Sequence, residues 1–181
     1  MYCGSLSTLS PQPSASSARR SDPDCLCLTG RVVVIQRYYR LRDREGRFIR
    51  PRCVKVEREV RDNLVVTVGR TFFCERARSN AESAVSHYAL GTDNTAPAAG
   101  QTALVAESYR ATLTRTKAFN AQLELTLHLG RTQGNGVTYK EGGAFNAASG
   151  GTMTARVIFS DKAKTSTNTL TVIHTISLTA S

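Results

Sequence analysis

The clearest pattern of hydrophobic and polar positions lies between residues 119 and 130. Apolar side chains alternate there with polar ones, and the apolar set is Ala121, Leu123, Leu125, Leu127 and Leu129. Strict alternation is typical of a β-strand with one face toward a core and the other toward water. We therefore expect a half-buried strand over residues 119–130, with the leucines on its buried face.

Other segments share this character in shorter form. Each is rich in Val, Ile, Thr or aromatic residues, and Gly-, Ser- or Asn-containing breaks separate them. The expected strands span residues 85–91, 109–116, 137–139, 153–159 and 169–179. Several short strands separated by turns predict a mainly β fold, an antiparallel β-sandwich or jelly-roll-like domain.

The segment after residue 30 has the pattern of a β-hairpin. Residues 31–39 are dense in β-branched and aromatic side chains, and residues 54–60 alternate on the return strand. Residues 43–46 supply the turn, and their glycine suits a positive φ. Pro51 interrupts the return strand and places it at an edge or bulge. We expect a ribbon that projects from the core or lies against another chain.

Two segments differ from the strand pattern. After Asn63, which can cap a helix, a Val run argues for a strand instead; we favour a short helix near residues 66–78. Residues 1–30 are rich in Ser and Pro and bury too little apolar surface to offset their ordering entropy. The expected organisation is an extended arm over 1–30, a basic β-hairpin over 31–62 and a β-sandwich domain over 63–181.

The net charge of +10 is unevenly distributed. Residues 31–62 carry eleven Arg or Lys against five Asp or Glu, whereas residues 1–30 are neutral overall. A basic segment of this kind seeks an acidic partner, which can be nucleic acid, an anionic surface or an acidic protein face.

The basic hairpin is the candidate binding site of the chain. Arginines interleaved with aromatic rings suit phosphate contact and base stacking on nucleic acid. They suit a protein interface equally well, because Arg and Tyr are enriched there. We favour protein docking over nucleic acid, with a merely solvated hairpin as the remaining alternative. The candidate residues are Arg37, Tyr38, Tyr39, Arg40, Arg42, Arg44, Arg47, Arg50 and Arg52.

The sequence contains no motif that predicts catalysis or a cofactor. His128 falls on the polar face of the leucine-rich strand, whereas His174 shares the apolar face of the last strand. A buried or interface histidine is the simpler interpretation of His174, and a metal or anion ligand at a symmetry axis is the alternative. The five cysteines match no zinc pattern, so free thiols are favoured over a clip that ties down the arm. We expect a non-enzymatic protein.

Targeting signals are also missing from the sequence. No apolar run approaches the roughly 18 residues of a spanning helix. The N-terminus lacks the charged start and apolar stretch of a secretory signal. We therefore expect a protein made and used in a reducing cytoplasm, with no membrane partner.

From Asn63 onward, the order of short motifs resembles that of tailed-bacteriophage virion proteins. The motifs are Asn63-Leu64-Val65-Val66, Ser86-His87-Tyr88-Ala89-Leu90-Gly91-Thr92, Asn94-Thr95-Ala96-Pro97-Ala98-Ala99-Gly100-Gln101-Thr102-Ala103-Leu104, Tyr139-Lys140-Glu141-Gly142-Gly143-Ala144-Phe145-Asn146-Ala147, Gly150-Gly151-Thr152-Met153-Thr154-Ala155-Arg156 and Lys164-Thr165-Ser166. The resemblance covers about two-thirds of the chain, and the arm and the hairpin lie outside it.

The resemblance implies an accessory module of the phage particle, as found among head-decoration, tail-fibre and collar proteins. Such modules are β-sandwiches, commonly trimeric, without chemistry of their own. The expected function is a capsid decoration or cement protein that binds the major capsid lattice, in a virion assembled in the bacterial cytoplasm. A tail, collar or fibre-attachment module bound to tail or neck proteins is the alternative. A nucleic-acid-binding protein that uses the Arg-rich hairpin is the second alternative.

Overall fold

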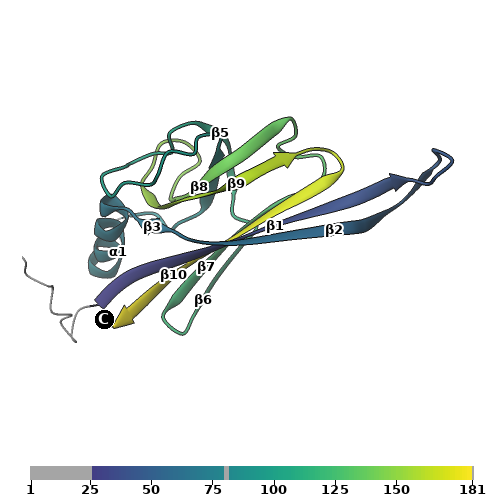
Figure 1. Ribbon diagram of the computed structural model, residues 1–181. Coiled ribbons are helices and arrows are strands. Elements are labelled where there is room, and N and C mark those ends of the chain that lie inside the picture. Colours follow the sequence, from purple (N-terminus) through teal and green to yellow (C-terminus); the bar gives the residue numbers. More distant parts are fainter. Residues whose placement is uncertain (1–25, 80–81, 181) are drawn as a thin grey trace, which may run out of the picture.

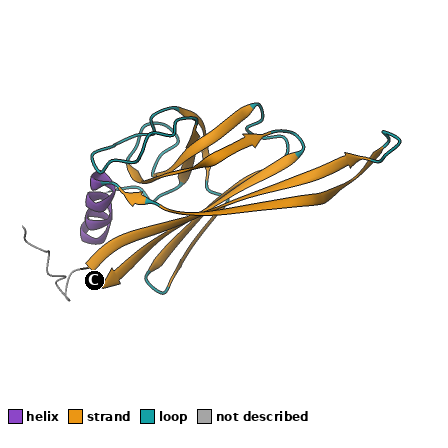
Figure 2. Ribbon diagram, viewed as in Figure 1, coloured by secondary structure: helices purple, strands orange, loops and turns teal. Residues whose placement is uncertain are grey.

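The computed structural model describes residues 26–79 and 82–180. These residues form two five-stranded antiparallel sheets packed as a sandwich, with one helix at one end (Figures 1 and 2). The predicted fold class, a mainly β antiparallel sandwich, is confirmed. Most of the expected arm, residues 1–25, lies outside the described residues.

The two sheets divide the strands between them. Sheet A has the order β2-β1-β10-β7-β6 and contains β1 (Leu26–Arg42), β2 (Phe48–Asp62), β6 (Arg115–Phe119), β7 (Gln122–Leu129) and β10 (Asn168–Ala180). Sheet B has the order β3-β9-β8-β4-β5 and contains β3 (Leu64–Val65), β4 (His87–Gly91), β5 (Glu107–Thr112), β8 (Val137–Phe145) and β9 (Met153–Lys164). The helix α1 (Thr67–Ser79) follows β3.

The core lies between the sheets because alternate residues of each strand face the opposite sheet. The leucines expected on one face of β7 include Leu125, Leu127 and Leu129, which are buried. Each buried Leu or Val contributes roughly 1.5–3 kcal/mol relative to an exposed one. Further core residues are Val32, Val34, Tyr88, Leu90, Tyr139, Ala155, Val157, Leu170 and Val172.

The strand expected over residues 109–116 is two strands in different sheets. β5 ends at Thr112 in sheet B, and β6 begins at Arg115 in sheet A. The backbone N–H of Leu113 donates to Ser86, and the next N–H donates to Thr126 on the other sheet. The chain therefore crosses between the layers at this point, and alternation alone does not reveal the crossing.

The expected hairpin is present, but its base belongs to the sandwich. β1 pairs with β10 from Leu26 to Tyr38 and with β2 on its other side. Residues 26–30, assigned from sequence to the arm, are thus part of a central strand of sheet A. The boundary expected at residue 62 does not separate the hairpin from the sandwich, because the hairpin's own strand completes the core.

The helix expected near residues 66–78 is α1, Thr67–Ser79. Asn63 does not cap it, since its side-chain amide lies 2.6 Å from the Nε2 atom of His174 instead. Gly69 faces the backbone of β9 so closely that a Cβ there would lie 2.0 Å from the carbonyl oxygen of Thr154. A glycine at this position lets the helix pack directly on sheet B.

The outer face of sheet B is covered by the loop of residues 92–106. Leu104 from this loop packs with Ala89, Phe145 and Met153 to form a second, smaller apolar cluster. Beside the cluster lie Glu141 of β8 and Arg156 of β9, both fully buried. Two glycines follow Glu141 in the sequence, and β8 continues through them to Phe145.

Glu141 and Arg156 connect the loop to the sheet. The Nε atom of Arg156 donates to the Glu141 carboxylate at 2.8 Å, and its Nη1 atom donates to Gln101 Oε1 at 3.0 Å. The same carboxylate accepts the backbone N–H groups of Val105 and Ala106 at 3.2 and 2.8 Å. The buried charge is thereby paired and the loop backbone is satisfied, as a buried ion pair requires.

A polar contact also crosses the core between the sheets. His174 of β10 is fully buried, with Nε2 against Asn63 and Nδ1 3.2 Å from the hydroxyl of Tyr88. Donation from the Asn63 amide to Nε2 leaves the proton of the neutral ring on Nδ1. Sequence analysis expected His174 to point inward, and the alternative of a ligand at a symmetry axis does not fit a ring enclosed within one chain.

Replacing Glu141 by alanine should destabilise the fold strongly. The substitution leaves the Arg156 guanidinium buried with only the more distant carboxylate of Asp93, 3.9 Å from its Nη2 atom. Removing the close partner of a buried ion pair costs about 3–5 kcal/mol of the free energy of unfolding. Chemical denaturation measures the loss, and hydrogen exchange should show the amides of residues 92–106 exchanging faster. The control is Glu75→Ala, which breaks an exposed pair with Arg78 and should cost at most about 1 kcal/mol. Equal losses would contradict the role of the buried pair.

The stability of the fold should depend on the protonation of His174. Burial lowers the pKa of His174 from 6.5 to about 3, so between these values the unfolded chain binds a proton that the folded chain does not. The free energy of unfolding therefore falls as the pH decreases through this range. His174→Gln should flatten the fall by up to about 1.4 kcal/mol per pH unit, measured by urea denaturation between about pH 5 and 6.5. The comparison is His128→Gln, at an exposed residue whose pKa is also lowered by burial, which should flatten the fall less than His174→Gln. An equal flattening in the two variants would refute this assignment.

Candidate partner-binding ribbon

Beyond Tyr39, β1 and β2 pair only with each other. The last contacts of β1 with the rest of sheet A are the register pair Tyr38–Asn168 and the hydrogen bond from the Tyr39 N–H to Thr167. Residues 40–52, called the ribbon from here on, project away from the sandwich (Figure 1). A two-stranded ribbon has marginal stability in water by itself, so its root must hold it.

The root of the ribbon is held from both sheets. The carboxylate of Glu59 on β2 accepts hydrogen bonds from Ser160 and Lys162 of β9, the latter at 2.7 Å. Although burial opposes ionisation, the hydrogen bonds from Lys162 and Ser160 lower the pKa of Glu59 to about 2. Glu59 and Ser160 are about a hundred residues apart, so no local signal in the sequence predicts this contact.

Three of the nine candidate residues lie at this root. The Tyr38 hydroxyl lies 3.0 Å from both Gln36 Oε1 and Glu57 Oε2, and burial together with the Glu57 carboxylate raises the pKa of Tyr38. Tyr39 is half-buried beside Arg131, and Arg37 is half-buried opposite Val56. The two tyrosine rings therefore belong to the support of the ribbon more than to its free surface.

The turn of the ribbon uses two more of the candidate arginines. Arg47 pairs with Asp43 at 2.7 Å and with Glu45 at 3.2 Å. Arg42 donates to the carbonyl of Gly46, whose φ of +80° confirms the expected turn glycine. The guanidinium of Arg42 also lies 3.7 Å above the ring centroid of Phe48, a contact worth about 0.5–1 kcal/mol when exposed.

The remaining four candidates, Arg40, Arg44, Arg50 and Arg52, are exposed. Within residues 26–79 and 82–180, none of these four guanidinium groups forms an ion pair. Arg40 and Arg52 are register partners on adjacent strands. Like charges directly opposite each other destabilise a β-ladder, so the free ribbon holds charge that an acidic partner would neutralise.

Large apolar side chains accompany these charges. Phe48 is 77% exposed, Val54 is 54% exposed and Val56 is 56% exposed. Exposed apolar groups beside arginines are the composition of a protein interface, in which anchors are surrounded by a polar rim. The ribbon and the adjoining part of β2 thus carry both components of a docking surface.

Other chemistry is sparse in the part of the chain that the structure describes. No group of three or more His, Cys, Asp or Glu side chains there has an arrangement that could hold a metal ion. No helix among those residues is long and apolar enough to cross a membrane. Cys53 and Cys74 are exposed free thiols, while Cys3 and Cys25 lie outside the described residues.

Reversing one charge of the Arg40–Arg52 pair should stabilise the free protein. Arg40→Glu replaces a repulsive cross-strand pair by an attractive one, which contributes roughly 0.2–1 kcal/mol. Slower hydrogen exchange at the ribbon amides would report this gain. Arg50→Glu is the matched control, because Arg50 stands at a register irregularity and has no partner residue across the strand. Identical exchange in both variants would show that the Arg40–Arg52 repulsion is negligible.

The chain was also compared with known proteins. It matches no family model, no curated protein and no solved structure.

Proposed function

We propose that this chain is a structural protein of a bacteriophage particle whose ribbon docks on an acidic face of a neighbouring virion protein. The observation that supports the docking is the ribbon itself, with four unpaired arginines and a register pair of like charges extending beyond the sandwich. Because the free ribbon contains this like-charge repulsion, a partner that supplies negative charge relieves the repulsion and binds more favourably.

The phage assignment is supported by the motif order after Asn63, and the function proposed first is capsid decoration. A cement protein binds a repeating lattice, so contacts that are weak in one copy become firm when many copies engage together. In this arrangement the protein binds as a trimer and bridges major capsid subunits. A tail, collar or fibre-attachment module is the alternative within the same class, with the ribbon inserted into a connector.

Nucleic-acid binding is the second alternative. The unpaired arginines and the exposed ring of Phe48 favour it, since phosphates and bases would contact charge and ring respectively. The half-buried positions of Tyr38 and Tyr39 weigh against it, because rings that support the root are not free to stack on bases. Docking on protein therefore remains the preferred proposal.

The virion assignment is tested by quantitative mass spectrometry of purified particles of the virus that encodes this chain. Hundreds of copies per particle are expected for a decoration protein, and a handful for a tail or collar module. Particles that lack the chain would overturn the virion assignment.

The docking role is tested with a ribbon variant that carries Arg40→Gln, Arg44→Gln, Arg50→Gln and Arg52→Gln. We expect at least tenfold fewer copies per particle without loss of stability. All four side chains are exposed and unpaired, and removal of the Arg40–Arg52 repulsion should raise the free energy of unfolding by at most about 1 kcal/mol. The control variant has the same net charge and carries Arg58→Gln, Arg70→Gln, Arg115→Gln and Lys117→Gln on the sandwich. Normal incorporation of the ribbon variant would refute docking through the ribbon.

A titration with duplex DNA separates the nucleic-acid alternative. Fluorescence anisotropy should detect no binding that depends on the four ribbon arginines. Tight binding that weakens steeply between about 50 and 200 mM salt, and that the ribbon variant loses, would replace protein docking by nucleic-acid binding.

A further inference from the structure

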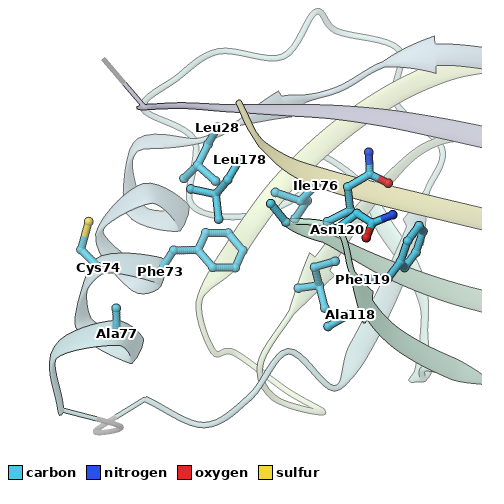
Figure 3. Close-up of a pocket in the computed structure, with 12 residues that line it drawn as sticks. Leu28, Phe73, Cys74, Ala77, Ala118, Phe119, Asn120, Ile176 and Leu178 are labelled. Atoms are coloured by element: carbon cyan, nitrogen blue, oxygen red, sulfur yellow. The ribbon is translucent and has the colours of Figure 1, made fainter. Parts of the chain in front are cut away.

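An apolar groove of about 710 Å³ lies at the end of the sandwich next to α1. Figure 3 shows Phe73 of α1 facing Leu28 of β1 and Leu178 of β10 across this space, with the β6–β7 turn at its far side. Leu178 is 52% exposed, although it is a large aliphatic side chain. The groove is therefore an apolar surface that the described residues leave open.

The groove continues the core of the sandwich. Leu28 lies on the same face of β1 as Val32 and Val34, and Leu123 lies on the same face of β7 as Leu125, by the alternation of the strands. The strands of sheet A extend past sheet B at this end, where α1 takes the place of the second layer (Figure 1). Core-facing side chains of sheet A are therefore exposed at this end of the sandwich. An apolar segment or partner is needed to cover them.

The turn between β6 and β7 gives a second indication that the groove is used. Asn120 and Ala121 have φ angles of 47° and 56°, in the left-handed region that favours glycine. Asn-Gly is the preferred pair for a two-residue turn of this kind, and alanine is strained there. Ala121 lines the groove. Its methyl group therefore adds apolar surface to the groove, although alanine strains the backbone at this position.

The sequence before β1 supplies a segment of matching chemistry. Residues 1–9, called the head, contain Met1, Tyr2, Cys3, Leu6 and Leu9. Residues 10–24, called the tether, contain Ala and Pro but no larger apolar side chain. The described chain begins at Leu26, two residues before the groove residue Leu28. We propose that the groove is the docking site for the head of the same chain.

The length of the tether favours the chain's own head over that of a second copy. A random coil of about 15 residues spans roughly 20 Å root-mean-square. The tether is followed by Leu26 of β1, two residues before the groove residue Leu28. A short tether of this kind gives an effective concentration in the millimolar range. At micromolar protein concentration, the tethered head therefore occupies the groove before a head from another molecule can.

Two cysteines of the chain provide the test. Cys74 on α1 lines the groove, as Figure 3 shows, whereas Cys53 lies exposed on β2 just beyond the ribbon. The full chain, which has five cysteines, is labelled briefly with a limiting amount of maleimide, and mass spectrometry of the separated peptides gives the labelling rates of Cys74 and Cys53. We expect the ratio of the Cys74 rate to the Cys53 rate to rise at least fivefold in the variant Leu6→Ser/Leu9→Ser, because the head then leaves the groove.

The matched control is Ala15→Ser/Ala18→Ser in the tether, which should leave that ratio unchanged. An unchanged ratio in the head variant would overturn the proposal. A ratio that rises on dilution of the unmodified chain from about 100 to 0.1 μM would also overturn it, because a second copy would then be the occupant. Both readouts are independent of particle binding, so this proposal can fail while the proposed function stands.

Discussion

The buried ion pair between Glu141 and Arg156 is the constraint on which one half of this molecule depends. A charge pair removed from water is unfavourable unless its remaining polar positions are filled. Here most of them are filled by the loop of residues 92–106, through two backbone N–H groups and the side chain of Gln101. The Nη2 atom of Arg156 has only its ion-pair contacts with Glu141 and Asp93. The pair therefore dictates where the loop lies, and the loop in turn shields the small apolar cluster around Leu104.

The consequence is a sandwich whose two outer faces differ. The outer face of sheet B is covered by the loop of residues 92–106. Sheet A carries the ribbon at one end and the open apolar groove at the other. The contacts that hold the ribbon, chiefly Glu59 with Ser160 and Lys162, tie sheet A to sheet B at the ribbon's root. A supported ribbon on one side and an open apolar groove on the other are the features from which both docking proposals are argued.

The fold was largely predictable, because alternation along one strand is a local signal. The leucines of β7 and the apolar residues of β10 alternate with polar ones, so the sequence shows which face is buried. The valines of β1 are consecutive, and their place in the core of the sandwich was not predicted. The partners of buried polar groups were not predictable in the same way. Asn63 has the position of a helix cap but contacts His174, and Glu141 meets Arg156 only because β8 and β9 are adjacent. The candidate arginines were found from composition, whereas their division between root, turn and free surface required the register of the hairpin.

The two register irregularities of the hairpin, between Tyr38 and Tyr39 and between Arg40 and Arg42, have a geometric effect on recognition. Bulges increase the right-handed coiling of a strand pair, so successive guanidinium groups point in different directions around the axis. A planar acidic surface could touch only some of them at once. The shape that best matches these diverging guanidinium groups is a cleft that encloses the ribbon from more than one side.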